Sequence, residues 1–278
     1  MVRVAAVDLG TNSTRLLIGD VEGDRVEEIV RLSTVTRLGE GVDAGRRLLP
    51  AAIARVHAVL ADYRRELEAL DAERSLAVAT SAVRDAANGA EFLAGVERAF
   101  RLPTRLLSGD EEAELTRRGV GAVGDTALVV DVGGGSTELI AAGFRTSLDI
   151  GSTRLSERFL HSDPPRPEEL AAAAEYVQGL LPPLEATSAV GVAGTVAQLR
   201  ALAGPLTLAA VEAELVRLAT VPLAERRLVA GLDPARAPVI VGGAVIVAEV
   251  LRRYRLAELV YSVRDLLDGA ALEAASGS

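Results

Sequence analysis

Short apolar runs that end in polar, glycine-rich turns alternate along the chain with longer segments of helical periodicity. Residues 2–7 and 127–130 are apolar runs with the length of buried strands. Residues 49–70 instead repeat apolar side chains at intervals of three and four, which predicts an amphipathic helix. Strands mixed with helices in both halves of the chain predict an α/β fold.

The same patterns predict the remaining elements. Further strands are expected at residues 25–34, 75–79, 104–107, 145–150, 190–193 and 259–262. Further helices are expected at residues 88–100, 110–120, 168–181 and 265–275, and helices are expected to follow residue 195 as far as about residue 254. Ser108 is the candidate N-cap of the helix at 110–120, which opens with acidic residues.

An internal repeat organises these elements. Residues 8–15 read DLGTNSTR and residues 131–138 read DVGGGSTE, so that Asp, Gly, Ser and Thr coincide, and each copy follows an apolar run. A repeat this widely spaced predicts two homologous domains rather than a solenoid. We expect a first domain at residues 1–122, joined by a C-terminal helix at 264–278, and a second domain at residues 123–263.

The two glycine-rich turns predict phosphate binding. A turn of this kind between two strands exposes backbone N–H groups in a concave nest, and Ser and Thr hydroxyls add donors. Asp8 and Asp131 stand at strand ends and suit a hydrated Mg²⁺ ion, which prefers oxygen ligands. A strand follows each turn, so the pattern is not a dinucleotide-binding fingerprint, which needs a helix there. The alternative is a pair of simple hairpins, which the doubled motif disfavours.

Composition narrows the chemistry further. The chain has 278 residues, no Cys and no Lys, which excludes disulfides, thiolate nucleophiles, a Walker-type loop and a Schiff-base lysine. His57 and His161 are too few for a histidine metal cluster. The net charge of −9 argues against a nucleic-acid partner, so an anionic substrate needs backbone amides, a few Arg and a metal ion. The apolar run at 2–7 is too short for a signal peptide and residues 239–250 predict a buried helix, so we expect a cytoplasmic protein without a membrane partner.

Five segments resemble the exopolyphosphatase/guanosine pentaphosphate phosphatase family, and they occur in the family's order. They are residues 8–13 (DLGTNS), 79–88 (ATSAVRDAAN), 108–115 (SGDEEAEL), 131–138 (DVGGGSTE) and 151–155 (GSTRL). The length resembles that of the short, two-domain members. The resemblance implies two actin-like (ribonuclease H-like) α/β domains with a cleft between them.

The resemblance also implies roles for individual residues. Glu112 matches the family's catalytic general base, and Arg84 matches an arginine that contacts phosphate. Asp131 and Glu138 match carboxylates associated with Mg²⁺ or Mn²⁺, and Asp8 is the third candidate ligand. The phosphate-binding candidates are the residues of the two loops, namely Gly10, Thr11, Asn12, Ser13, Arg15, Gly133, Gly134, Gly135, Ser136 and Thr137.

The residues alone leave several of these roles open. Glu112 stands beside Glu111 and Glu114, and an acidic helix start commonly serves the helix dipole. Arg84 could equally pair with Asp85 at the surface. Arg15 could reach phosphate or pair with a carboxylate, whereas Glu138, which stands in its place in the second repeat, must point to a site or be paired.

Two segments depart from the family's pattern. Gly194 and Thr195 resemble the segment that binds adenosine in the wider superfamily, but a simple turn from strand to helix explains them equally well. The family's tail often reads Ser-x-x-Gly-Leu-Arg-x-Gly, whereas Asp265 and Leu267 replace its Gly and Arg here. A substrate contact from a tail arginine is therefore not expected, unless Arg264 replaces it.

The expected function is that of a Mg²⁺-dependent phosphohydrolase that releases terminal orthophosphate from inorganic polyphosphate. Guanosine pentaphosphate is the alternative substrate, and a non-catalytic sensor of polyphosphate or a nucleotide is the alternative of another class. A kinase is disfavoured because no acceptor site is evident. A homodimer remains an open expectation.

Overall fold

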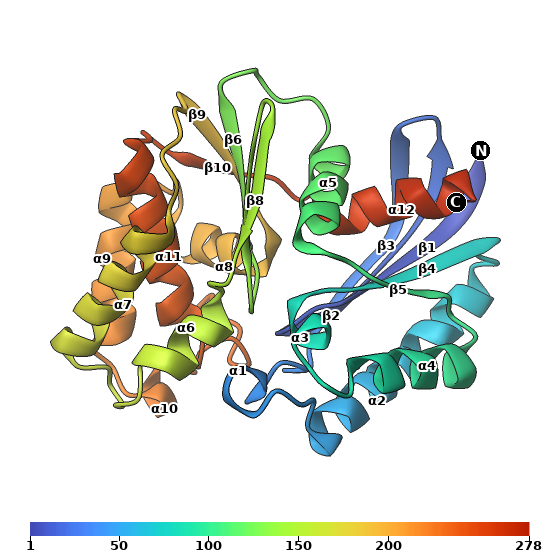
Figure 1. Ribbon diagram of the computed structural model, residues 1–278, viewed down its shortest axis with the longest axis horizontal. Coiled ribbons are helices and arrows are strands. Elements are labelled where there is room, and N and C mark those ends of the chain that lie inside the picture. Colours follow the sequence, from blue (N-terminus) through green and yellow to red (C-terminus); the bar gives the residue numbers. More distant parts are fainter. Residues whose placement is uncertain (278) are drawn as a thin grey trace. The chain divides into compact units, whose positions relative to one another are not determined.

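The computed structural model describes residues 1–277 and divides into two compact units. The first unit holds residues Met1–Gly121 together with the chain from Arg264 onward. The second unit spans residues Ala122–Val263. Each unit is built around one five-stranded sheet with helices packed on it, so the predicted α/β class is confirmed (Figure 1).

The sheet of the first unit has the strand order β3-β2-β1-β4-β5. Its strands are β1 (Val2–Leu9), β2 (Ser13–Glu22), β3 (Arg25–Val35), β4 (Arg74–Ala79) and β5 (Thr104–Leu106). Strands β1, β2 and β3 form an antiparallel meander, whereas β4 and β5 run parallel to β1. Parallel strands need a crossover connection, and helices provide it here.

Both faces of this sheet are covered, because successive side chains of a strand point to opposite faces. Ala5 and Val7 pack with helices α2 (Pro50–Ala69) and α4 (Gly89–Phe100). Val4 and Ala6 pack on the other face with α5 (Gly109–Val120) and α12 (Leu266–Ser276). Two single-turn helices, α1 (Val42–Gly45) and α3 (Ser81–Arg84), complete the unit.

The sheet of the second unit repeats this topology. Its strands are β6 (Ala127–Val132), β7 (Thr137–Ala141), β8 (Phe144–Leu148), β9 (Ser188–Val192) and β10 (Leu259–Tyr261). Their order is β8-β7-β6-β9-β10, and the first three strands are again antiparallel while β9 and β10 run parallel to β6. The repeat seen in the sequence is therefore a repeat of structure.

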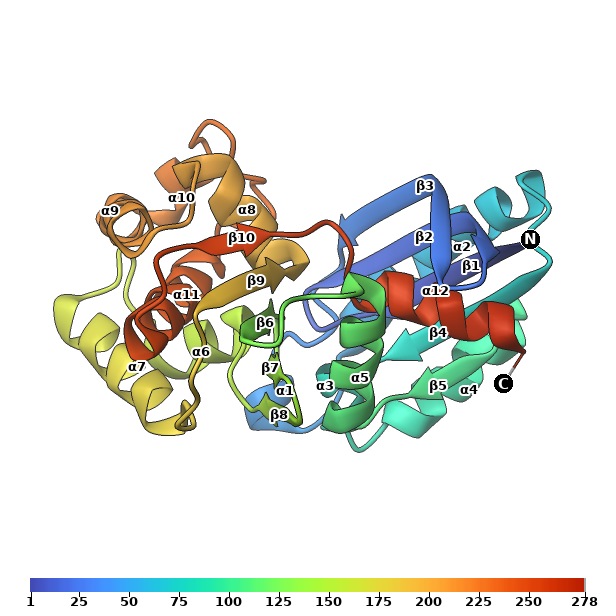
Figure 2. The same cartoon turned by 90° about the horizontal axis from the view of Figure 1, so that it is seen from above.

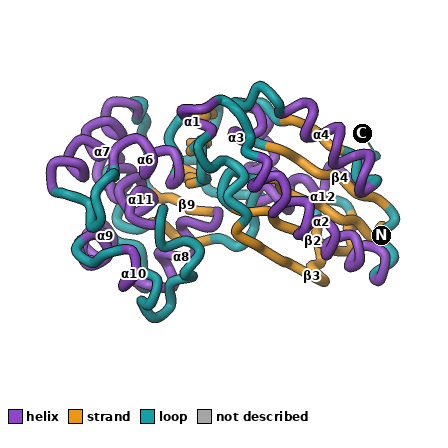
Figure 3. The backbone as a smooth tube through the Cα atoms, turned by 90° about the horizontal axis from the view of Figure 1, so that it is seen from below, coloured by secondary structure: helices purple, strands orange, loops and turns teal. Residues whose placement is uncertain are grey.

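Helix α11 (Ile240–Tyr254) is the centre of the second unit's core. It contacts α6 (Ser152–Phe159), α7 (Pro167–Leu180), α8 (Ala193–Ala203) and α9 (Leu208–Ala219), and a short α10 (Leu223–Arg226) lies nearby (Figure 3). Nearly all of its residues are buried, as expected for the apolar run at 239–250. In residues 1–277, none of the helices has both the length and the apolar character to cross a bilayer.

Most predicted elements lie within a few residues of the observed ones, but α6 is missing from the prediction. Its residues, Ser152–Phe159, are mostly polar or charged, and the two apolar ones, Leu155 and Phe159, are too few to mark an apolar stripe in the sequence. Contacts of its first turn with the neighbouring glycine-rich loop hold it in place.

Helices α5 and α12 lie side by side because both carry a glycine at their contact (Figure 2). A Cβ atom at residue 269 would overlap the carbonyl oxygen of Leu115, and one at residue 119 would overlap the carbonyl oxygen of Asp265. The two backbones therefore approach more closely than any side chain allows. This contact fixes the C-terminal helix on the first unit.

Replacing Gly269 by Ala is expected to destabilise the protein by ~1–3 kcal/mol or more, because the added methyl group must force two backbones apart. Urea unfolding monitored by circular dichroism measures the shift of the midpoint. Gly95→Ala is the matched control, since a Cβ there meets no atom within 4 Å. That control should be stabilised by ~0.5–1 kcal/mol, and equal behaviour of the two variants contradicts the close approach.

Candidate functional site

The first glycine-rich loop joins β1 to β2, and a buried ion pair lies beneath it. Asp8 is the cross-strand neighbour of Arg15, whose Nε donates to Asp8 Oδ2 at 2.9 Å. The carboxylate is buried, and its other oxygen, Oδ1, has no hydrogen-bond partner. Burial raises the pKa of Asp8, although Arg15 opposes the shift. The nearby Asp265 carboxylate raises that pKa further.

The loop itself leaves one polar side chain unsatisfied. The Gly10 N–H donates to the Ser13 carbonyl at 3.1 Å and closes the turn, while the Thr11 hydroxyl bonds the Ser81 hydroxyl at 3.0 Å. The Asn12 side chain is buried, and neither its oxygen nor its nitrogen has a partner. An unsatisfied buried amide costs ~1–3 kcal/mol, so this side chain is suited to a bound polar ligand.

The second loop joins β6 to β7 with the same hydrogen bond, from the Gly133 N–H to the Ser136 carbonyl at 3.0 Å. Asp131 faces Glu138 across the two strands, in the register that Asp8 and Arg15 occupy in the first unit. Asp131 is 5% exposed and Glu138 only 1% exposed. Two buried carboxylates opposite one another repel, so each depends on hydrogen bonds or positive charge around it, and Ser147 donates to Glu138 Oε1 at 2.7 Å.

The donor set of this pair fits Mg²⁺ or Mn²⁺. Mg²⁺ in proteins is commonly held by one or two carboxylates together with waters and substrate phosphates. Within residues 1–277, no group of three or more carboxylate, imidazole or thiolate side chains is arranged to hold a metal ion. Asp131 and Glu138 thus remain two candidate ligands, while Asp8 lies in the first unit with one oxygen on Arg15.

The first turn of helix α6 donates three backbone hydrogen bonds to the second loop. The N–H of Ser152 donates to the Gly133 carbonyl at 2.9 Å, and the N–H groups of Thr153 and Arg154 donate to the Gly134 carbonyl at 2.8 and 3.0 Å. The Thr153 hydroxyl is buried without a partner. Sequence reasoning did not single out Thr153, although it lies in the quoted segment 151–155.

The three neighbouring glutamates of α5 have different environments. Glu111 forms a capping box with Ser108, accepting from its N–H at 2.8 Å, and also pairs with Arg105. The Ser108 N–H, Arg105 and the Ser108 hydroxyl together lower the pKa of Glu111 to about 2. Glu114 pairs with Arg117 at 2.7 Å on the surface. Glu112 alone is buried, at 6% exposure.

Arg84 forms an ion pair with Glu112. The sequence leaves open a pairing of Arg84 with Asp85 instead. Arg84 Nη1 donates to Glu112 Oε2 at 3.3 Å and to the Leu107 carbonyl at 2.7 Å. Arg84 is supplied by α3, directly after β4, and Glu112 by the first turn of α5. The predicted base and the predicted phosphate-binding arginine are therefore neighbours in the first unit.

The structure also shows the surroundings of the remaining predicted residues of the two loops. Thr137 donates from its hydroxyl to the Ile150 carbonyl at 2.6 Å, and Gly135 lies in the second loop beside Ser136, which is buried. Arg15 pairs with carboxylates, which was one of its two open roles; a contact with phosphate stays a prediction.

The sequence analysis also named three positions outside the two loops, and each of them packs against other side chains of the protein. His57 packs against Phe92 and Phe100, with ring centroids at 6.2 and 5.5 Å. Gly194 lies at the start of α8, and the Arg236 guanidinium fills the space where a Cβ would stand. Leu267, in place of a family arginine, is buried in the apolar core of the first unit.

Glu111→Gln is expected to lower stability by ~0.3–1 kcal/mol at pH 7, because the amide keeps the capping bond but loses the negative charge at the helix start, beside Arg105. The depressed pKa of Glu111 adds stability above its ordinary value of 4.5, and this contribution disappears as the pH falls towards about 2. Urea midpoints measured from pH 7 to pH 2 should therefore converge for wild type and variant. A difference that stays constant over that range contradicts the assignment.

Comparison with known proteins assigns the chain to a family. The sequence profile described as the Ppx/GppA phosphatase family matches residues 17–275. Exopolyphosphatase 2 of Mycobacterium tuberculosis is 40% identical over a 318-residue alignment that covers 99% of each chain.

Two solved structures are similar to this chain over nearly its whole length. The crystal structure of an exopolyphosphatase-like protein has a TM-score of 0.90 and 32% identity, covering 98% of this chain and 97% of that one. An exopolyphosphatase from Cytophaga hutchinsonii has a TM-score of 0.88 and 26% identity, covering 96% of each chain. The chain therefore belongs to the Ppx/GppA phosphatase family.

Proposed function

We propose that this protein is a Mg²⁺-dependent exopolyphosphatase that releases orthophosphate from the end of inorganic polyphosphate. The observation that carries the proposal is the buried carboxylate pair Asp131 and Glu138, placed beside a glycine-rich loop. The 40% identity to Exopolyphosphatase 2 of M. tuberculosis over nearly the whole chain supports polyphosphate as the substrate class.

In the second unit, Asp131 and Glu138 are the residues that would hold the metal ion. When bound, Mg²⁺ neutralises negative charge on the phosphate oxygens, which is much of what phosphoryl transfer requires. Ser147 donates to Glu138 Oε1 at 2.7 Å and so orients that carboxylate. The Gly133 N–H closes the turn on Ser136, so the backbone N–H groups of Gly134 and Gly135 are the ones that suit phosphate oxygens in this loop.

In the first unit, Glu112 is the proposed general base. It takes a proton from water as the water oxygen bonds to the terminal phosphorus and the phosphoanhydride P–O bond breaks. The products are orthophosphate and a chain one unit shorter. The hydrogen bond from Arg84 orients Glu112, and we assign the other N–H groups of this guanidinium to a substrate phosphate oxygen.

Phosphate release from polyphosphates of several lengths and from guanosine pentaphosphate, with and without Mg²⁺, tests this function. Polyphosphate should be hydrolysed only with the divalent cation, and Asp131→Asn should raise the Mg²⁺ concentration needed for half-maximal rate by ~10–100-fold. If the protein hydrolyses guanosine pentaphosphate faster than polyphosphate, guanosine pentaphosphate replaces polyphosphate as its substrate. Ligand binding without hydrolysis identifies a sensor, and unchanged Mg²⁺ activation of the variant removes Asp131 from the site.

Glu112→Gln is expected to lower turnover by ~10²–10⁴-fold while polyphosphate still binds, because the amide keeps the shape but accepts no proton. Steady-state phosphate release and equilibrium binding measure the two effects. Glu111→Gln and Glu114→Gln are the controls and should hydrolyse polyphosphate at nearly the wild-type rate. Loss of turnover in a control but not in Glu112→Gln shows that the base is misassigned.

A further inference from the structure

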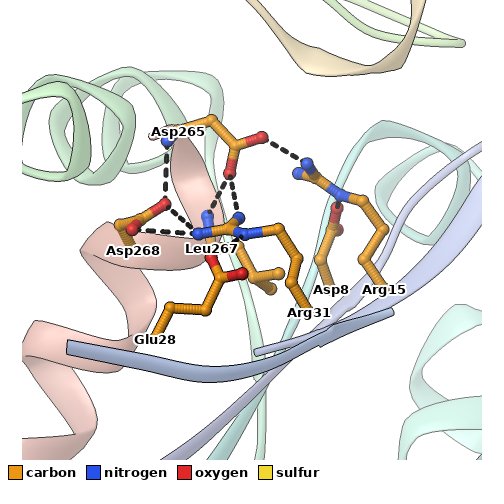
Figure 4. A network of polar contacts seen from close by, with 7 residues as sticks. All are labelled: Asp8, Arg15, Glu28, Arg31, Asp265, Leu267 and Asp268. Carbon is orange, nitrogen blue, oxygen red and sulfur yellow. Dashed lines mark hydrogen bonds and ion pairs between the residues drawn. The ribbon is translucent and has the colours of Figure 1, made fainter. Parts of the chain in front are cut away.

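A network of six charged side chains lies on the face of the first unit's sheet that α12 covers (Figure 4). Its members are Asp8, Arg15, Asp265, Arg31, Asp268 and Glu28. All three aspartates are less than a tenth exposed. A buried carboxylate is tolerated only when it is paired, so each member depends on its neighbours.

Asp265 is the link in this network that joins the C-terminal helix to the first loop. Its Oδ2 pairs with Arg15 Nη1, while Arg15 Nε holds Asp8 Oδ2 at 2.9 Å. Its other oxygen, Oδ1, accepts from the Leu267 N–H at 2.9 Å as the N-cap of α12. The cap therefore fixes the carboxylate so that Oδ2 faces Arg15.

The helix that carries Asp265 is itself rigidly placed. The glycine contact between α12 and α5 sets these two backbones against each other, and Asp265 contributes its carbonyl oxygen to that contact. Helix α5 carries Glu112. Asp265 thus ties the Asp8–Arg15 pair to the same rigid pair of helices that positions Glu112.

The arrangement also leaves one oxygen of Asp8 available. Asp8 Oδ2 is held by Arg15, whereas Oδ1 is buried without a partner. Both oxygens lie close beneath the loop, 3.4 and 3.5 Å from the point where a Cβ of residue 10 would stand. Arg15, held at its far end by Asp265, fixes which oxygen of Asp8 is occupied.

We infer that Asp265 is a positioning residue for the first loop: by holding Arg15, it fixes Asp8 for the reaction. The inference rests on the proposed function, because it assumes that this loop takes part in hydrolysis. A purely structural role, as the cap of α12, is the alternative. The two roles use different oxygens of the same carboxylate, so one substitution separates them.

Asp265→Asn is that substitution, because the amide oxygen keeps the cap on Leu267 while the amide nitrogen cannot accept from Arg15. We expect kcat/KM with polyphosphate to fall by ~10–100-fold. Adding Asp265→Asn to an Arg15→Gln variant should change kcat/KM by less than about twofold, because the residue acts through Arg15. Additive losses, or an unchanged kcat/KM in the single variant, overturn the inference.

Asp268→Asn is the matched control. Asp268 is equally buried in the same helical turn, where it pairs with Arg31 and accepts from the Asp265 N–H at 3.0 Å, a bond that the amide oxygen of Asn keeps. Asp268 does not pair with Arg15. It should lower the unfolding midpoint and leave kcat/KM close to wild type. A loss of activity as large as that of Asp265→Asn shows that general damage to α12, not the hold on Arg15, is responsible.

A second readout does not depend on activity. The side-chain Nε–H signal of Arg15 in ¹⁵N NMR, assigned by its absence in Arg15→Lys, reports the bond to Asp8. Its hydrogen exchange should quicken in Asp265→Asn and stay slow in Asp268→Asn. If the wild-type protein hydrolyses no phosphate, the proposed function fails, while unchanged exchange in Asp265→Asn overturns the inference separately.

Discussion

The antiparallel register at the ends of β1 and β6 determines where the charges of the candidate site lie. In each unit the last residues of the inner strand pair with the first residues of the next strand across a short glycine-rich turn. This register places Asp8 opposite Arg15 and Asp131 opposite Glu138. A shift of one residue would move all four side chains to the other face of their sheets.

One difference at equivalent positions separates the chemistry of the two units. An arginine opposite the aspartate makes a neutral pair in the first unit, which Asp265 extends towards the C-terminal helix. A glutamate there makes an acidic pair in the second unit, where a divalent cation suits the charge. The same hairpin therefore carries a neutral pair in one unit and an acidic pair in the other, because a single position differs in charge.

The sequence predicted the doubled hairpin, the α/β class and most elements, since apolar strands and glycine-rich turns are local signals. The residues alone left the three glutamates of α5 equivalent, because burial depends on what packs over a helix and not on the helix alone, and only the family resemblance singled out Glu112. The sequence analysis also missed Thr153 and the pairing of Asp265 with Arg15. Those depend on contacts between residues distant in the chain, such as Arg15 with Asp265, which no local pattern records.

Burial and pairing distinguish the neighbouring carboxylates of α5 from one another. Glu111 reaches back to the helix start, where N–H groups and Arg105 keep it ionised at all ordinary pH values, so it is a poor proton acceptor. Glu114 lies on the surface with Arg117, where an ion pair contributes little. Glu112 is the buried glutamate of the three. Its partner, Arg84, is the arginine that the sequence analysis predicts to contact phosphate. The helix that carries this proposed base is itself fixed in position by the backbone contact of α5 with α12.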